Sequence, residues 1–288
     1  MKNKLPSLFI LLAAFLWGLT GIFVRNLNSQ GLDNFGLLFF RSAITSATLF
    51  IYLFITDRSK LKIQFRDIWY FIGTGILSFT FFGICYFYTI ANASMSLAAM
   101  LLYTAPIFVM LMSAIFFREK ITAVKVFALI TAAIGSFLIC GQDKNIYVKP
   151  FIIFTGLASG FCYALYSIFG RVALKKYSSA TVTVYTFLFA TIASMFVSDF
   201  PAIISVAKSH PDTIGLACLF AYISAFFPYI FYTQGLKNTE PGKAAVMATF
   251  EAVVASVAGV IVFGETLTLI SIAGIVLVLF SVFLLNRK

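Results

Sequence analysis

The chain has 288 residues, of which 61% are hydrophobic and only 11% are charged, and its mean hydropathy is +1.00. Soluble domains carry about 25% charged residues, so this composition excludes an ordinary soluble protein and predicts an integral membrane protein. The net charge of +11 does not indicate nucleic-acid binding, because the basic residues stand between apolar runs and form no single patch.

Ten apolar runs follow one another along the chain, and each is long enough to cross a bilayer as a helix. They cover residues 6–24, 34–55, 68–91, 95–117, 122–140, 150–171, 180–199, 213–235, 242–263 and 268–285. The runs are continuous and lack the alternation of barrel strands, so we predict an all-α integral membrane fold with ten transmembrane helices. No cleavage site ends the first run, so we expect it to be retained as the first helix.

The distribution of lysine and arginine predicts how the chain is oriented. If the amino terminus is cytoplasmic, the segments on that side carry 15 Lys and Arg residues, and the segments on the other side carry 4. Such an excess of basic residues marks the cytoplasmic face of a membrane protein. We therefore expect a multi-pass protein of the cytoplasmic membrane with both termini in the cytoplasm.

Neither a cofactor nor a metal ion is expected. The four cysteines, Cys85, Cys140, Cys162 and Cys218, have no metal-ligand spacing, and the only histidine, His210, is expected in a loop. The chain also has no phosphate-binding GxxxxGK[ST] motif and no Ser/His/Asp set. These features argue against an ATP-driven motor and against an enzyme.

An internal repeat becomes visible when the chain is shifted by 146 positions. The shift matches Trp17 with Tyr163, Arg25 with Arg171, Ala98–Ala99 with Ala244–Ala245, Phe117 with Phe263, Glu119 with Glu265, and Thr122 with Thr268. Residues 1–141 and 150–288 are therefore predicted to be two repeats of five helices each. An odd number of spans places the two repeats in opposite orientations. For Glu119 and Glu265 we expect only a role at helix starts that Thr122 and Thr268 cap.

Several stretches occur in a characteristic order. They are Trp17–Gly18 in the first span, Arg41 within FFRSA in the second, and AAMLLYTAPIFVMLMSAIFFREKIT in the fourth, which AAVMATFEAVVASVAGVIVFGETLT echoes in the ninth. Together they resemble the EamA family of the drug/metabolite transporter superfamily over nearly the whole chain. The resemblance implies a transporter of small metabolites, often amino acids or related compounds, and often an exporter. The family often has Glu-Pro in the ninth span, whereas Ala252 follows Glu251 here, so we expect a less kinked ninth helix.

Two charged residues, Arg41 and Glu251, lie inside predicted spans and away from the span ends. Glu251 is near the middle of the ninth span, where a carboxylate is costly and should face protein or a water-filled cavity. We interpret it as the group that binds a substrate amine or takes up a proton, with a structural glutamate held by hydrogen bonds as the alternative. Arg41 in the second span has two interpretations: extension to the outer headgroups or pairing with a helix C-terminus, which is favoured for a long basic side chain, and attraction of an anionic substrate group.

Aromatic residues complete the predicted site, because a buried hydroxyl needs a partner and aromatic rings attract cations. Trp17 and Tyr163 are matched by the repeat, and we expect them to face each other across a pseudo-two-fold axis. The predicted substrate-binding residues are Glu251, Trp17, Tyr163, Tyr88, Tyr103, Tyr232 and Arg41.

These features predict a secondary transporter that moves small metabolites, amino acids or related compounds, outward across the cytoplasmic membrane by alternating access. Proton coupling through Glu251 is the simplest driving force. An importer of an organic cation such as a quaternary amine is one alternative, and a flippase or membrane enzyme acting on lipid-linked groups is another. The expected partners are the substrate, the lipid bilayer and protons, without nucleic acid, and both a monomer and a homodimer remain open.

Overall fold

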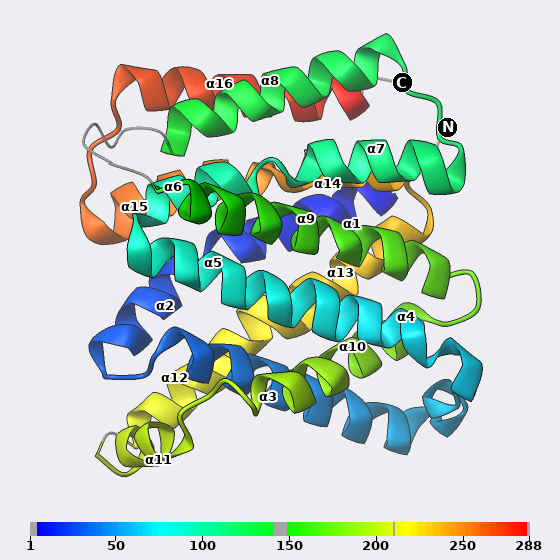
Figure 1. Ribbon diagram of the computed structural model, residues 1–288, viewed down its shortest axis with the longest axis vertical. Helices are drawn as coiled ribbons and strands as arrows, with labels where there is room; N and C mark the ends of the chain where they lie inside the picture. The colour runs from blue at the N-terminus through cyan, green and yellow to red at the C-terminus, as the bar shows by residue number, and fades with distance from the viewer. Residues whose placement is uncertain (1–4, 141–148, 210, 287–288) are drawn as a thin grey trace.

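The chain folds into a bundle of helices in the computed structural model, which describes residues 5–140, 149–209 and 211–286 (Figure 1). Outside these ranges lie the predicted repeat limits at 1, 141 and 288, and the loop and tail residues Lys2, Lys4, Lys144, His210, Arg287 and Lys288. Both ends of the chain lie at the same end of the bundle, on the right in Figure 1. That end is called the terminal end below, and the other is called the opposite end.

The helices follow one another without any strand in the described ranges. The first half contains α1 (Leu5–Gly18), α2 (Thr20–Ser29), α3 (Asn34–Thr56), α4 (Ile68–Ile72), α5 (Phe81–Asn92), α6 (Met95–Leu102), α7 (Ala105–Phe117) and α8 (Ala123–Cys140). The second contains α9 (Pro150–Ala173), α10 (Ser179–Ser194), α11 (Phe200–Ser209), α12 (Asp212–Ala221), α13 (Phe227–Lys237), α14 (Pro241–Ala248), α15 (Phe250–Phe263) and α16 (Leu269–Asn286). Two π-helical segments, Gly73–Thr80 and Tyr222–Phe226, join α4 to α5 and α12 to α13.

Within the described ranges, nine helical segments are long and apolar enough to cross a membrane, which confirms the predicted membrane fold. The seventh predicted span, 180–199, is not one of these nine segments. It is the 16-residue helix α10, which rises about 24 Å against a hydrocarbon core about 30 Å thick. The next helix, α11, packs into the bundle, because its Ile203 belongs to one buried cluster with Leu32 and Leu37.

The two repeats build matching helix ends. Arg118 ends α7 with a φ of 55°, and Gly264, 146 positions later, ends α15 with a φ of 68°. The next residues, Glu119 and Glu265, bond through their backbone N–H groups to the carbonyls of residues 113 and 259, at 3.3 Å in both repeats. The predicted cap of the tenth span is confirmed, because the Ser271 N–H donates to the Thr268 hydroxyl at 3.1 Å. The repeat is therefore a repeat of backbone geometry as well as of sequence.

Arg118→Gly should stabilise the protein. Arg118 is the only non-glycine residue with positive φ in the described ranges, and a left-handed conformation costs an L-residue roughly 1–2 kcal/mol. Glycine, which occupies the matching position 264, avoids this cost but loses about 0.5–1 kcal/mol of backbone freedom. The expected net result is a rise in Tm of a few degrees, measured by thermal unfolding in detergent. Arg118→Ala is the control, since it removes the charge but keeps Cβ, and an equal rise in Tm for alanine would contradict the backbone explanation.

The fourth and ninth spans are both interrupted near their middle. The Thr104 hydroxyl and N–H both bond to the Leu101 carbonyl, at 2.6 and 3.2 Å. The Thr249 hydroxyl and N–H bond to the Val246 carbonyl in the same way, at 2.7 and 3.2 Å. This tight turn separates α14 from α15 although no proline follows Glu251. Interrupted helices expose backbone polar groups at membrane depth, as transporters do around their substrate sites.

The repeat-related helices α8 and α16 lie side by side at the upper edge of Figure 1. They approach most closely at Gly135 and Gly274. A Cβ atom on Gly135 would lie 2.7 Å from the Gly274 carbonyl oxygen, and one on Gly274 would lie 2.6 Å from the Gly135 oxygen. Only glycine at both positions allows this distance between the two helices.

The largest buried cluster lies at the centre of the bundle. It joins Phe79 of the first π-helical segment, Tyr166 of α9, and Tyr229 and Tyr232 of α13. Trp17, at the end of α1, packs against it. This cluster of rings is where the predicted aromatic residues meet.

Candidate functional site

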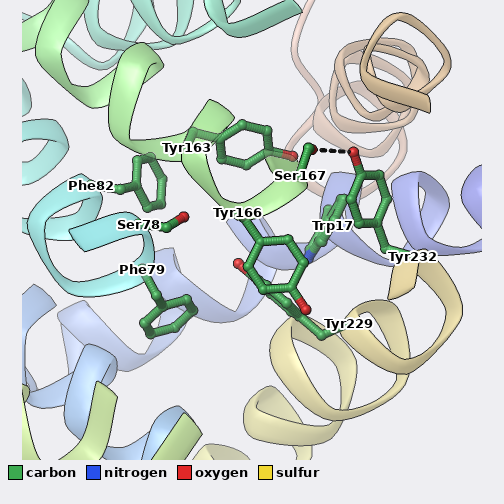
Figure 2. Close-up of a pocket in the computed structure, with 9 residues that line it drawn as sticks. All are labelled: Trp17, Ser78, Phe79, Phe82, Tyr163, Tyr166, Ser167, Tyr229 and Tyr232. Atoms are coloured by element: carbon green, nitrogen blue, oxygen red, sulfur yellow. Dashed lines mark hydrogen bonds between the residues drawn. The ribbon is translucent and has the colours of Figure 1, made fainter. Parts of the chain in front are cut away.

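An aromatic pocket occupies the centre of the bundle (Figure 2). It is lined by Trp17, Ser78, Phe79, Phe82, Tyr163, Tyr166, Ser167, Tyr229 and Tyr232. These residues come from α1, from the π-helical segment Gly73–Thr80 with the start of α5, and from α9 and α13. Both repeats therefore contribute to the pocket.

Helical spacing explains why these side chains converge. Tyr163, Tyr166 and Ser167 on α9 are three and four positions apart, and Tyr229 and Tyr232 on α13 are three apart, so each set lies on one helix face. The two faces are joined by hydroxyl groups. The Ser167 and Tyr232 hydroxyls lie 2.8 Å apart, and the Tyr166 hydroxyl lies 2.8 Å from that of Thr233 (Figure 2 shows the first pair). These bonds fix the wall that α9 and α13 form.

The rings fill the pocket almost completely. Trp17 contacts Tyr229 and Tyr232 with ring centroids 5.3 Å apart in each case, and Tyr163 at 6.3 Å. The predicted contact between Trp17 and Tyr163 is thus confirmed. Only about 10 Å³ of free volume remains, which is room for about one water molecule. Any larger ligand must push the rings apart.

Arg41 reaches this pocket from α3. Its guanidinium lies over the Phe79 ring, 4.4 Å from the centroid, and it interacts electrostatically with Tyr229. The Nε atom is buried and makes no hydrogen bond to a described residue. The alternative in which Arg41 extends to the headgroups does not match this position, because the side chain points inward.

Glu251 lies in the first turn of α15, directly after the interruption at Thr249. The partly buried side chain is close enough to Tyr86, Tyr103 and Tyr163 to interact with them electrostatically. No hydrogen bond or ion pair joins the carboxylate to any residue in the described part of the chain. The hydrogen bonds required by the alternative of a structural glutamate are therefore not present there.

The absence of a side chain at Gly18 positions Glu251 beside the pocket. A Cβ atom on Gly18 would lie 2.8 Å from the Glu251 carbonyl oxygen and 2.5 Å from Cβ of Val254. The start of α15 therefore packs directly on the end of α1, next to Trp17. The two residues of the Trp17–Gly18 stretch thus have different roles. Trp17 lines the pocket, and Gly18 leaves the space that α15 needs to pack against α1.

The structure brings together most of the predicted site residues. Trp17, Tyr163 and Tyr232 line the pocket, and Arg41 adjoins it. Tyr103 lies at the interruption between α6 and α7 and interacts electrostatically with Glu251. Tyr88 does not belong to this group. Its side chain is 40% exposed and packs against Phe151 on the bundle surface.

Six lining residues were not predicted: Ser78, Phe79, Phe82, Tyr166, Ser167 and Tyr229. The spacing of Tyr166 and Ser167 from Tyr163, and of Tyr229 from Tyr232, is a signal that could have identified three of them. Phe79 and Phe82 are two among 35 phenylalanines. Phe79 enters the site from a π-helical segment that has no sequence signature, and Phe82 enters it from the start of α5 directly after that segment.

A second, larger cavity of about 1180 Å³ opens at the terminal end. Its lining combines the ends of α7, α9 and α16 with the starts of α8 and α14. The charged lining residues are Arg118, Glu119, Lys120, Lys125, Arg171, Lys175, Glu240 and Lys243. Arg171 follows Ser167 by one helical turn, so one face of α9 leads from the aromatic pocket to this cavity.

Comparison with known proteins gives consistent matches along the chain. A model of the EamA-like transporter family matches residues 4–141 and, separately, residues 150–287. An uncharacterized transporter from Archaeoglobus fulgidus is 29% identical over 96% of this chain and 97% of its own length. The pseudopaline exporter CntI from Pseudomonas aeruginosa is 27% identical over 63% of this chain and 57% of its own length. A protein of known crystal structure superimposes with a TM-score of 0.78 at 14% identity, covering 97% of this chain and 94% of the other, which supports the fold.

Proposed function

Because this chain belongs to the EamA-like transporter family, we propose that it exports small zwitterionic metabolites, amino acids or related compounds, across the cytoplasmic membrane. The two repeats would open the central pocket to one side of the membrane and then to the other. Support for the outward direction comes from the relative that is named an exporter.

The observation that carries the proposal is a pair of opposite charges beside one pocket. Arg41 adjoins the pocket at Phe79, and Glu251 adjoins it at Tyr163. Within the described ranges, neither charge has an ion-pair partner. An unpaired charge at membrane depth is costly and is typically kept for function. A zwitterion supplies both missing partners, with its carboxylate at Arg41, its ammonium at Glu251 and its apolar part among the rings.

Coupling of transport to protons would use the same carboxylate, that of Glu251. A substrate ammonium and a proton would compete for Glu251, so that release of substrate on one side allows a proton to bind and return. The basic residues concentrated at the terminal end support a cytoplasmic location for that end. The cavity of about 1180 Å³ would then be the cytoplasmic entrance.

Ligand binding by charge-neutralised variants tests this proposal. A ligand stabilises the folded state by about 2.7 kcal/mol when its concentration is 100-fold above Kd. We expect amino acids to raise the Tm of the wild type in detergent, and to lose this effect in Glu251→Gln and in Arg41→Gln. Carboxylic acids without an amine should still stabilise Glu251→Gln, and amines without a carboxylate should still stabilise Arg41→Gln. Tyr88→Phe is the control, because that side chain lies away from the pocket.

The same experiment separates a second candidate function. Trp17, Tyr229 and Tyr232 next to a carboxylate also suit a quaternary ammonium ion, through cation–π attraction. An importer of organic cations predicts that choline-like compounds stabilise the wild type and Arg41→Gln equally, and that amino acids have no effect. Amino-acid shifts that persist in both neutralised variants would refute the zwitterion site.

A further inference from the structure

An exposed ion pair joins the two repeats at the opposite end of the bundle. Arg25, in α2 of the first repeat, lies 3.3 Å from the carboxylate of Glu265, in the loop after α15 of the second repeat. The Arg25 guanidinium also covers the Phe263 ring, 4.2 Å from its centroid. The expectation that Glu265 serves only a helix start is therefore too narrow.

The repeat places the same three residue types at the terminal end, in the positions Arg171, Phe117 and Glu119. There the arrangement differs. All three residues line the open cavity of about 1180 Å³, and no ion pair joins Arg171 to Glu119 in the described structure. Arg171 instead donates hydrogen bonds to the carbonyls of Leu236 and Lys237, at 2.6 Å each.

Among the described residues, none forms a salt bridge with the Glu119 carboxylate. Burial raises its pKa, and the nearby carboxylate of Glu240 raises it further, while Lys125, a hydrogen bond from the Gly242 backbone N–H and Arg171 oppose the shift only in part. The ammonium group of Lys125 is engaged by Glu240 in an ion pair. Glu119 is therefore an acceptor that Arg171 would satisfy if the cavity closed.

Arg171 lies on the same face of α9 as two pocket residues, whereas the path from Trp17 to Arg25 passes from α1 into α2 across the turn at Leu19. Tyr163, Ser167 and Arg171 are spaced by four residues on α9, and the matching residues in the first repeat are Trp17, Gly21 and Arg25. Because the repeats are inverted, one series leads from the pocket to the terminal end and the other leads to the opposite end. Movement of Tyr163 or Trp17 in the pocket walls would therefore be passed along the chain to Arg171 at one end and to Arg25 at the other.

We propose that Arg171 and Glu119 are positioning residues that pair when the terminal end closes, while Arg25 and Glu265 separate at the opposite end in the same step. The structure then represents the state that is open at the terminal end, and the state open at the other end follows by exchanging the roles of the two repeats. The inference rests on the proposed alternating-access function, but it does not depend on which substrate is moved.

Distances between spin labels at both ends test the exchange. Cysteines for labelling replace Lys120 and Lys175 at the terminal end and the matching exposed residues Thr266 and Ser29 at the opposite end, with the four native cysteines changed to serine. Arg25→Gln should lengthen the distance at the opposite end and shorten it at the terminal end. An exposed ion pair of this kind supports a population change of roughly two- to fivefold.

The terminal-end pair is tested by a second substitution in the same protein. Adding Glu119→Gln to Arg25→Gln should remove the shorter terminal-end distance. Adding Glu119→Arg or Arg171→Glu alone should also remove it, whereas both reversals together should restore it. Lys208→Gln is the control, because it neutralises an exposed basic residue on α11 outside both pairs.

The proposal is overturned if Arg25→Gln leaves both distances unchanged, or if the shorter terminal-end distance persists after Glu119→Gln is added. These measurements need no substrate. Distances that change as expected in a protein that binds no zwitterion would therefore refute the proposed substrate while supporting the paired gates. Zwitterion binding without any exchange of distances would support the substrate and refute the gates.

Discussion

Glu251→Gln is expected to abolish transport of amino-acid substrates while the protein remains folded. The substitution keeps the shape of the side chain but removes the negative charge beside Tyr163, so that neither a substrate ammonium nor a proton is held there. Loss of one partner of a buried charge pair typically costs about 2–5 kcal/mol, which corresponds to a decrease on the order of 100-fold in binding. Efflux from proteoliposomes under an imposed pH gradient measures this loss.

Exchange of labelled for unlabelled substrate, without a gradient, distinguishes the two roles of the carboxylate. If Glu251 both binds the ammonium and couples the proton, exchange is lost together with gradient-driven flux. Asp57→Asn is the control, since it makes the same chemical change in a loop carboxylate that pairs with Lys60. Wild-type flux in folded Glu251→Gln would remove this residue from the mechanism.

Gly135→Ala and Gly274→Ala should each destabilise the protein, and Gly135→Leu should prevent the native packing of α8 and α16. Each new Cβ atom would lie within 2.7 Å of a backbone carbonyl oxygen of the other helix, and a backbone cannot move aside as a flexible side chain does. Overpacking of this kind costs about 1–3 kcal/mol. The loss should appear as a lower Tm in detergent, with leucine worse than alanine.

Gly215→Ala is the matched control for these substitutions. Gly215 is also in a helix, α12, but a Cβ atom there meets no atom within 4 Å. Alanine should therefore leave Tm unchanged or raise it, because it stabilises a helix by roughly 0.5–1 kcal/mol relative to glycine. Equal destabilisation at all three positions would show that the crossing of α8 and α16 is not the cause.

The inverted repeat made much of the fold predictable from sequence. A single shift of the sequence aligned Arg25 with Arg171 and Glu119 with Glu265. It also placed Trp17 opposite Tyr163, and the contact between the two rings confirms this. Apolar runs predicted nine spans correctly, because a bilayer requires length and hydrophobicity that are visible in a sequence. The shortness of α10 was not visible, since the apolar run continues beyond Ser194 while the helix does not.

The sequence identified residues of the site only where a charged side chain stands out in an apolar span. Glu251 and Arg41 are conspicuous because few charges occur inside spans, and both adjoin the pocket. Tyr88 lies apart from the pocket, which the sequence does not indicate, because one tyrosine among thirteen gives no sign of the direction in which it points. Phe79 could not be predicted for the same reason, since its position depends on a π-helical segment and on packing between distant helices.

The nearly filled pocket has a consequence for the concentrations at which the protein operates. If the form with separated rings is a small fraction of the population, the apparent Kd exceeds the intrinsic Kd by the inverse of that fraction, so about 1% of open form weakens binding about 100-fold. A substrate at its ordinary intracellular level would then leave most molecules empty, and appreciable flux would begin only once the compound accumulates. Tight packing around Trp17 would thus act as a threshold, releasing surplus metabolite while the working pool is retained.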